Sequence, residues 1–143
     1  MKISTRTRYG VRAALELALH YNQGPLQLRI IAQRQGISVK YLEQLVAVLR
    51  SGGILRSVRG ARGGYLLTRA PDQINMIDIF SCLEGSIATT ECVADQNSCN
   101  RAGECVARQL WVDVEDAVNN ILANVTLQDL IEKSSGNTQN YQI

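Results

Sequence analysis

Apolar residues recur at helical spacing in three stretches at the start of the chain. The first stretch follows Ser4 or Thr5, either of which can cap a helix, and carries Tyr9, Ala13, Leu15, Leu17, Ala18 and Leu19. The second, "LQLRIIAQRQG", is short and ends at Gly36. The third begins at Ser38 and ends at the glycine pair 52–53, and its apolar face consists of Leu42, Leu45, Val46 and Leu49. Two helices joined through "QGIS" predict a helix-turn-helix, whose second helix enters the major groove of DNA.

A β-hairpin is predicted next. The stretch "ILRSVRGARGGYLLTR" alternates apolar and basic residues, turns at residues 60–64 and resumes with apolar residues. Arg59 and Arg62 lie at its tip among glycines. The glycines have two interpretations: they let the backbone approach a phosphate or lie in a narrow minor groove, or they supply the positive φ of an exposed turn. Because the hairpin directly follows a helix-turn-helix, we favour the first interpretation, in which it is the wing of a winged helix.

The second half of the chain predicts two further helices. Apolar residues in "APDQINMIDIFSCLEGSI" indicate a helix packed under the wing, on which Cys82 is expected to be a small core residue. From Gln109, "QLWVDVEDAVNNILANV" places one apolar stripe opposite a row of acids. The stripe consists of Leu110, Trp111, Val114, Val118, Ile121, Leu122 and Val125. Because no second helix remains to cover this stripe, it predicts a dimerisation element.

The predicted fold is mainly α with a small β-wing. A winged helix-turn-helix domain spans residues 1–84, a cysteine-bearing loop residues 85–108, and the dimerisation helix residues 109–132. Within the last range, "TLQDLI" is expected to be a final turn capped by Thr126 and Asp129. The polar tail, residues 133–143, is expected to be disordered. A composition of 45% hydrophobic but only 5% aromatic residues fits a helical core of aliphatic side chains.

The net charge of +2 conceals two halves of opposite sign. Residues 1–70 contain twelve Lys and Arg against two acids, whereas residues 71–143 contain three against eleven. A basic block of this size in the half that holds the helix-turn-helix indicates binding to a nucleic acid.

Several other classes are disfavoured. The N-terminus "MKISTRTRYG" has no apolar signal core, and no stretch approaches the roughly 20 apolar residues of a membrane span. A cytoplasmic location is therefore expected. We find no catalytic constellation, since there is one histidine, no phosphate-binding glycine loop and no paired acids in a plausible cleft.

The exposed polar residues of the third helix suggest distinct contacts with DNA. Gln44 can pair with adenine through two hydrogen bonds, and Glu43 can accept one from cytosine, so both are expected to set specificity. Lys40, Arg50 and Arg62 are better assigned to phosphates, whose neutralisation makes binding strongly dependent on salt.

The order of motifs resembles a known family. "MKIST", "RYG", "GIS" followed by "YLEQL", and "SVRGARGGYLL" are similar to the winged-helix transcription regulators that include IscR, the iron-sulfur cluster regulator, and CymR, the cysteine metabolism regulator. The resemblance covers essentially the whole chain. It implies a homodimer that binds an imperfectly palindromic double-stranded operator. It also implies that Arg59 reaches the minor groove and that six residues lie in or beside the recognition helix: Ser38, Lys40, Tyr41, Glu43, Gln44 and Arg50.

Three of the four cysteines lie within fourteen residues, "CVADQNSCNRAGEC". Their spacing is poor for structural zinc, which favours close cysteine pairs and four ligands, whereas iron-sulfur clusters accept thiolates from an open loop. The spacing is also similar to that of cluster-binding members of the family. We therefore assign Cys92, Cys99 and Cys105 as ligands of a 2Fe-2S or 4Fe-4S cluster. Unliganded redox-active thiols are the alternative.

The fourth ligand is not identified by the sequence. By resemblance, some members place a histidine three residues after the last cysteine, and others use an acid near the eighth position of the partner. Here those positions hold Arg108 and Arg8, which do not coordinate iron. The remaining candidates are an external ligand, an acid from elsewhere in the chain, or Glu91, Asp95, Glu104 and His20.

The C-terminus "NYQI" is a weaker signal. Serine acetyltransferases have a similar aromatic and isoleucine ending that docks into cysteine synthase, so Tyr141 and Ile143 could dock to that enzyme; an accidental isoleucine in a disordered tail is the alternative.

Three functions are consistent with the sequence. The first is a regulator of iron-sulfur cluster biogenesis or related genes, in which cluster occupancy modulates operator binding. The second is a metal-free thiol-redox or cysteine-metabolism repressor. The third, an iron-sulfur protein of electron transfer, leaves the basic half and the wing without a role.

Overall fold

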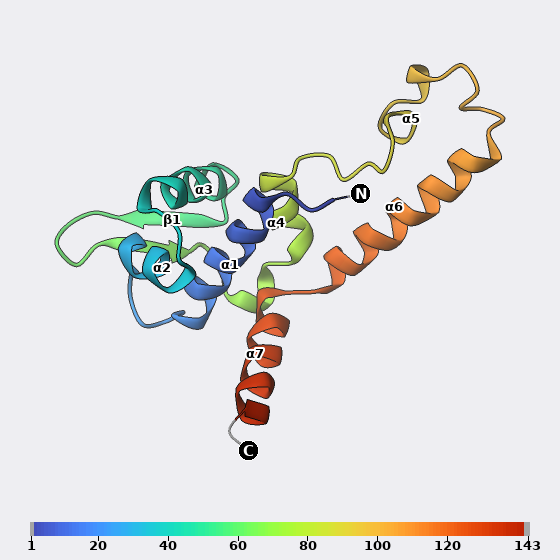
Figure 1. Cartoon of the computed structure of the whole chain (residues 1–143). Coiled ribbons are helices and arrows are strands. Elements are labelled where there is room, and N and C mark those ends of the chain that lie inside the picture. The colour runs from blue at the N-terminus through green and yellow to red at the C-terminus, as the bar shows by residue number, and fades with distance from the viewer. Residues whose placement is uncertain (1, 142–143) are drawn as a thin grey trace.

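The computed structural model describes residues 2–141, and of residues 137–141 only the backbone. A helical body carries a two-stranded wing at one side, and a long helix reaches away from the body at the other (Figure 1). The elements in chain order are α1 (Thr5–Leu19), α2 (Leu28–Gln35), α3 (Val39–Ser51), β1 (Leu55–Val58), β2 (Gly64–Leu67), η1 (Pro71–Gln73), α4 (Met76–Leu83), α5 (Glu91–Ala94), η2 (Gln96–Ser98), α6 (Val106–Asn124) and α7 (Leu127–Tyr141). The predicted mainly α fold with a β-wing is confirmed.

The first three helices begin and end where local chemistry predicts. The Ser4 side chain accepts a hydrogen bond from Thr7 N at the start of α1, and Ser38 accepts one from Tyr41 N at the start of α3. Each bond satisfies an amide that has no partner within its helix. Gly36 adopts the left-handed conformation at the end of α2. The helix-turn-helix is therefore specified largely by its caps.

The wing pairs β1 with β2 antiparallel, with Leu55 opposite Leu67 and Val58 opposite Gly64. It is held to the body by a bridge at the beginning of β2, where Tyr65 N donates to Leu26 O at 2.9 Å and Leu26 N donates to Tyr65 O at 3.0 Å. Gly64 has φ +152°, and a Cβ there would lie 2.5 Å from Leu26 O. Only glycine permits this close approach of two backbones.

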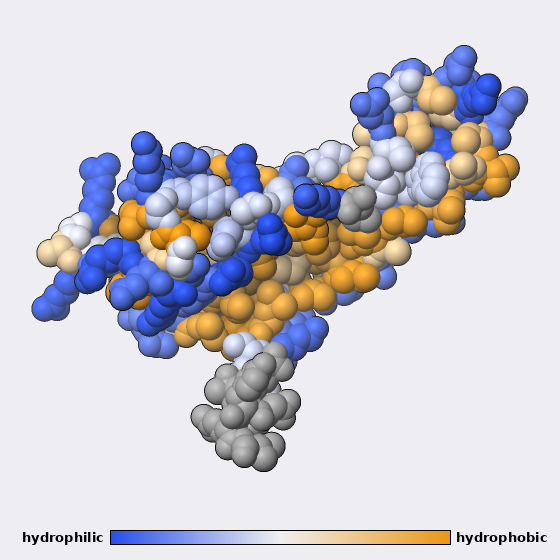
Figure 2. All heavy atoms as spheres, viewed as in Figure 1, coloured by the Kyte–Doolittle hydropathy of each residue, from blue (hydrophilic) through white to orange (hydrophobic). Residues whose placement is uncertain are grey.

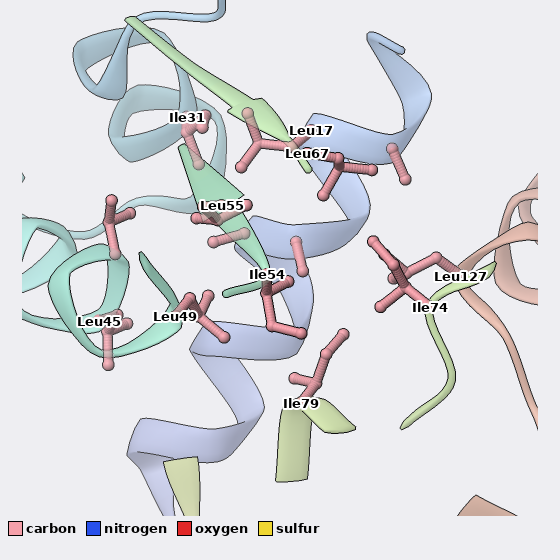
Figure 3. Packing of buried hydrophobic residues seen from close by; sticks show 14 of the residues in the cluster. Leu17, Ile31, Leu45, Leu49, Ile54, Leu55, Leu67, Ile74, Ile79 and Leu127 are labelled. Atoms are coloured by element: carbon pink, nitrogen blue, oxygen red, sulfur yellow. The ribbon is translucent and has the colours of Figure 1, made fainter. Parts of the chain in front are cut away.

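A single core joins the winged region to the base of α6 and α7. Aliphatic side chains from α1, α3, β1 and α4 meet in its centre, and Leu127 of α7 lies against Ile74 (Figure 3). Two backbone hydrogen bonds fix this junction: Met76 N donates to Val125 O at 2.8 Å, and Leu127 N donates to Ile74 O at 3.0 Å. The C-terminal end of α6 is thus anchored to the body that carries α3.

Three expectations for the second half need correction. The segment 85–108 is not wholly a loop, because it contains α5 and η2, and α6 begins at Val106 rather than Gln109. Residues 106–108 include no helix breaker, so the helix extends back to the Cys105 cap position.

The expected final turn is a full helix, α7, which continues to Tyr141 through much of the tail expected to be disordered. Ile143 and the side chain of Tyr141 lie outside the described residues.

Glu84, which follows α4, ties the end of that helix to the start of α1. Its carboxylate accepts hydrogen bonds from Ser4 Oγ at 2.8 Å, from Ser4 N at 3.4 Å and from the Thr7 hydroxyl. The Thr7 hydrogen bond, followed by those of Ser4, holds the pKa of Glu84 below its ordinary value of 4.5. The charged carboxylate is therefore stabilised in the folded state, next to the linker that leads to the cysteines.

We expect Glu84→Gln to lower the thermal unfolding temperature at neutral pH. A lowered folded-state pKa means that the carboxylate stabilises the fold above its ordinary value of 4.5, and that this contribution is lost as the pH falls through the lower folded-state value. The difference between wild type and variant should thus shrink in acid. Thermal unfolding followed by circular dichroism at pH 7 and pH 3 checks this, and a difference independent of pH would contradict it.

Candidate nucleic-acid interface and cysteine segment

The polar residues predicted to face DNA lie on the outer side of α3. Lys40, Glu43, Gln44 and Arg50 are exposed, while the apolar side of the same helix is buried in the core. Ser38 is also exposed, and its oxygen accepts the capping hydrogen bond from Tyr41 N at 3.0 Å. The helix thus presents one polar face that is free to enter a groove.

Tyr41 has a different environment from its neighbours on α3. It is half-buried, and its ring meets Tyr9 of α1 edge to face with the centroids 6.2 Å apart. The guanidinium of Arg12 lies over the Tyr9 ring, 5.2 Å from its centroid. The ring of Tyr41 therefore packs the start of α3 against α1.

Among the residues whose side chains the structure describes, no acid pairs with the basic side chains of α3 and the wing. The ion pairs found among the residues with described side chains are Arg34 with Glu16 and Arg69 with Asp78. Neither involves Lys40, Arg50, Arg59 or Arg62, all of which are exposed. These cations are available to neutralise phosphates.

Val39 was missed by the sequence reasoning. It has the spacing of the apolar face of α3, yet 41% of its surface is exposed because it lies in the first turn, beyond the body. An exposed valine beside Lys40 suits contact with the methyl group of thymine. Its apolar character offered no signal, since the same residue type fills the core.

The cysteine segment, residues 92–105, lies at the tip of the molecule away from the body (Figure 1). Cys92 lies on α5 and is half-buried, Cys99 follows η2 and is exposed, and Cys105 occupies the cap position of α6. All three have free thiols. Cys82 lies instead at the edge of the core, where burial and, to a smaller extent, Asp78 raise the pKa of its thiol.

Within the part of the chain that the structure describes, no three His, Cys, Asp or Glu side chains are gathered closely enough to hold a metal ion. The candidate acids Glu91, Asp95 and Glu104 are exposed in or beside the cysteine segment, whereas His20 caps α1 at the end remote from it. The donor set nevertheless fits an iron-sulfur cluster, because three free thiols on one surface segment supply the thiolates it requires.

The long helix α6 exposes much of its apolar stripe. Leu110 and Ile121 of the stripe are 55% and 62% exposed, while Leu122 and Val125 pack against the core; Val106, at the start of the helix, is 81% exposed. In the space-filling view a hydrophobic band continues along α6 and onto the body (Figure 2). An apolar surface of this kind on a helix suits contact with another protein surface.

A buried helix-turn-helix scaffold, an exposed recognition helix and an adjoining two-stranded wing define a winged-helix transcriptional regulator. The chain belongs to the Rrf2 family, described as "Iron-dependent Transcriptional regulator", whose model matches residues 3–133. The predicted resemblance is thereby confirmed, and the relatives are named as regulators rather than enzymes.

Relatives of two kinds are similar to this chain. The HTH-type transcriptional regulator CymR of Bacillus subtilis is 43% identical over 99% of this chain and 97% of its own length. The HTH-type transcriptional regulator IscR of Pectobacterium atrosepticum is 40% identical over 92% of this chain and 79% of its own length. The solved structure of CymR, titled the global cysteine regulator of B. subtilis, matches with a TM-score of 0.80 and 43% identity, covering 93% of this chain and 98% of that one.

Among the described residues no helix is long and apolar enough to cross a membrane.

Proposed function

We propose that this Rrf2-family regulator is a homodimeric repressor that senses an iron-sulfur cluster, acts in the cytoplasm and controls genes of cluster biogenesis or related processes. The observation that carries the proposal is the placement of three free thiols on one segment between the winged domain and α6. Cys92, Cys99 and Cys105 would hold the cluster. When bound, the cluster would join the three cysteines to one another. Its loss on oxidation or iron shortage would release them and change the conformation of the segment.

The chain itself offers a route from the cysteine segment to DNA. The segment is continuous with α6, and the base of α6 is fixed to residues 74–76 by two backbone hydrogen bonds. A reordering of the segment would shift α6, and with it the separation of the two recognition helices in a dimer. Because half-site spacing is set by that separation, operator affinity would change.

A second copy of the chain is the proposed occupant of the exposed α6 stripe. The exposed apolar residues of α6 form a hydrophobic band that continues onto the body (Figure 2). A symmetric pairing with the same band of a second copy would cover it, and an imperfect palindrome would require such a pairing.

The test measures iron and sulfide in protein purified without oxygen, and operator binding by the loaded and metal-free forms. Matched iron and sulfide with different operator affinities would support cluster sensing. Protein that stays metal-free after reconstitution would exclude it.

A metal-free cysteine-metabolism repressor is the second candidate. It is favoured by the similarity to CymR over nearly the full length of both chains, and by thiols that are not gathered in one place. In that case cysteine synthase would be a partner, with Tyr141 and Ile143 as the docking residues. Loss of a complex with cysteine synthase on deleting Ile143 would support this candidate.

Base-edge and phosphate contacts should respond differently to mutation. We expect Gln44→Ala to weaken operator binding by about 1–3 kcal/mol and to relax the preference at one base pair, because a two-bond contact with adenine is lost. Lys40→Ala should weaken binding to all sequences similarly and reduce the salt dependence by about one phosphate contact. Fluorescence anisotropy with operator and scrambled duplexes at several salt concentrations checks both. Equal loss on both duplexes for Gln44→Ala would contradict the assignment.

A further inference from the structure

The cysteine segment is closed at its base by two hydrogen bonds. Thr89 Oγ1 donates to Trp111 O at 3.1 Å, and Arg108 Nε donates to Cys92 O at 3.1 Å. They join Thr89, just before α5, and Cys92, on α5, to the first turns of α6. We call this pair of hydrogen bonds the neck.

The neck determines the position of Cys92 in particular. Arg108 is half-buried, and its guanidinium reaches the carbonyl of the cysteine itself rather than that of a neighbour. Thr90 Oγ1 lies 3.0 Å from Cys92 Sγ. A thiolate has no proton, so the Thr90 hydroxyl would donate to the sulfur in that state. Cys92 is therefore held through both its backbone and its side chain, whereas Cys99 is exposed.

Arg108 is unsuited to ligate iron, because a guanidinium remains protonated and has no acceptor. Its position in the neck gives it another role. Hydrogen bonds from beyond the ligand shell orient metal ligands, and a nearby cation favours the more negative state of a metal centre.

We propose that Arg108 is a positioning residue for Cys92: it closes the neck, holds α5 against α6, and places a fixed positive charge at the backbone carbonyl of Cys92. The significance of this role for sensing rests on the proposed function, but the closure of the neck is a property of the metal-free chain. A cysteine held in place lowers the entropy lost when three thiols gather around a ligand.

The first test measures hydrogen exchange in the metal-free protein at the amides of α5. Val93 N and Ala94 N donate to Thr90 O, and Asp95 N donates to Glu91 O, so these amides report whether α5 is intact. We expect Arg108→Gln to speed their exchange about tenfold, because a hydrogen bond from a charged donor is lost. Arg101→Gln removes an exposed arginine from the same segment and is the matched control, for which no change is expected. Unchanged exchange in Arg108→Gln would overturn the proposal.

Two more readouts separate positioning from a purely structural role. Alkylation of Cys92 in the metal-free protein should become faster in Arg108→Gln, while that of the exposed Cys99 stays the same; equal rates at Cys92 in wild type and variant would count against the neck. In reconstituted protein the reduction potential of the cluster should shift downward in Arg108→Gln, because a cation is removed. An unshifted potential would contradict the proposed effect of the Arg108 charge on the cluster. If wild type takes up no cluster, the proposed function fails, whereas exchange and alkylation still decide the role of Arg108.

Discussion

Replacing Ile121 by glutamate is expected to convert the protein into a monomer and to weaken operator binding by at least about a hundredfold. Ile121 is 62% exposed on α6 and lies on the apolar stripe of that helix, beside Leu122 and Val125, which pack on the core. In a dimer a carboxylate there would be buried among the apolar side chains of the interface, where its loss of hydration is costly. A monomer engages only one half-site, so the gain from simultaneous binding of two half-sites is lost.

Ala123→Glu is the matched control for Ile121→Glu. It adds the same charge two residues further along α6, at an exposed position on the opposite side of the helix from the stripe. Size-exclusion chromatography with light scattering gives the oligomeric state, and anisotropy with a full operator and a half-operator gives the affinities. Dimers that persist in Ile121→Glu would contradict the proposed interface, and so would an equal effect of Ala123→Glu.

Gly64→Ala is expected to detach the wing from the body and to destabilise the protein, with a strain of about 1–3 kcal/mol from the backbone alone. Gly64 has φ +152°, and an added Cβ would lie 2.5 Å from Leu26 O and 2.7 Å from Leu26 C. Both obstacles are backbone atoms, which cannot move aside as a flexible side chain can. Relief requires breaking the bridge between Tyr65 and Leu26, which holds the wing in place.

Gly103→Ala tests whether this effect is specific, because an added Cβ at Gly103 meets nothing within 4 Å. Thermal unfolding should be lowered clearly in Gly64→Ala and hardly in Gly103→Ala. Operator affinity should also fall in Gly64→Ala at a temperature where the body is still folded, since Arg59 and Arg62 would lose their placement. Wild-type affinity and stability in Gly64→Ala would show that the close approach has no importance.

The glycines of the wing illustrate the limit of sequence reasoning. The pattern "RGARGG" suits both an approach to a phosphate and a turn that needs positive φ. In the structure, a Cβ at Gly63 would collide with the Val58 carbonyl inside the turn, and Gly64 lies against the backbone of residue 26. Both glycines serve the packing of the wing itself. The contact between β2 and the segment before α2 joins residues distant in sequence, which local pattern does not reveal.

The cysteine segment was only partly predictable. Its thiols, their spacing and its place between two helices follow from the sequence, but α5, η2 and the neck do not. α5 is held by hydrogen bonds with α6 that arise only in three dimensions. The role of Arg108 was hidden for the same reason, since the sequence marked it only as a residue unable to bind iron.

The sequence by itself determined the elements of the winged helix, because caps, glycine stops and helical periodicity act within a few residues of one another. It also determined the separation of charge between the two halves and the family resemblance. The tertiary structure alone decided which face of each element is free. It packed Tyr41 on Tyr9, exposed Val39, tied Glu84 to the start of α1 and left part of the α6 stripe uncovered. These outcomes depend on contacts between segments far apart along the chain, and their energies are set by packing and burial rather than by local propensity.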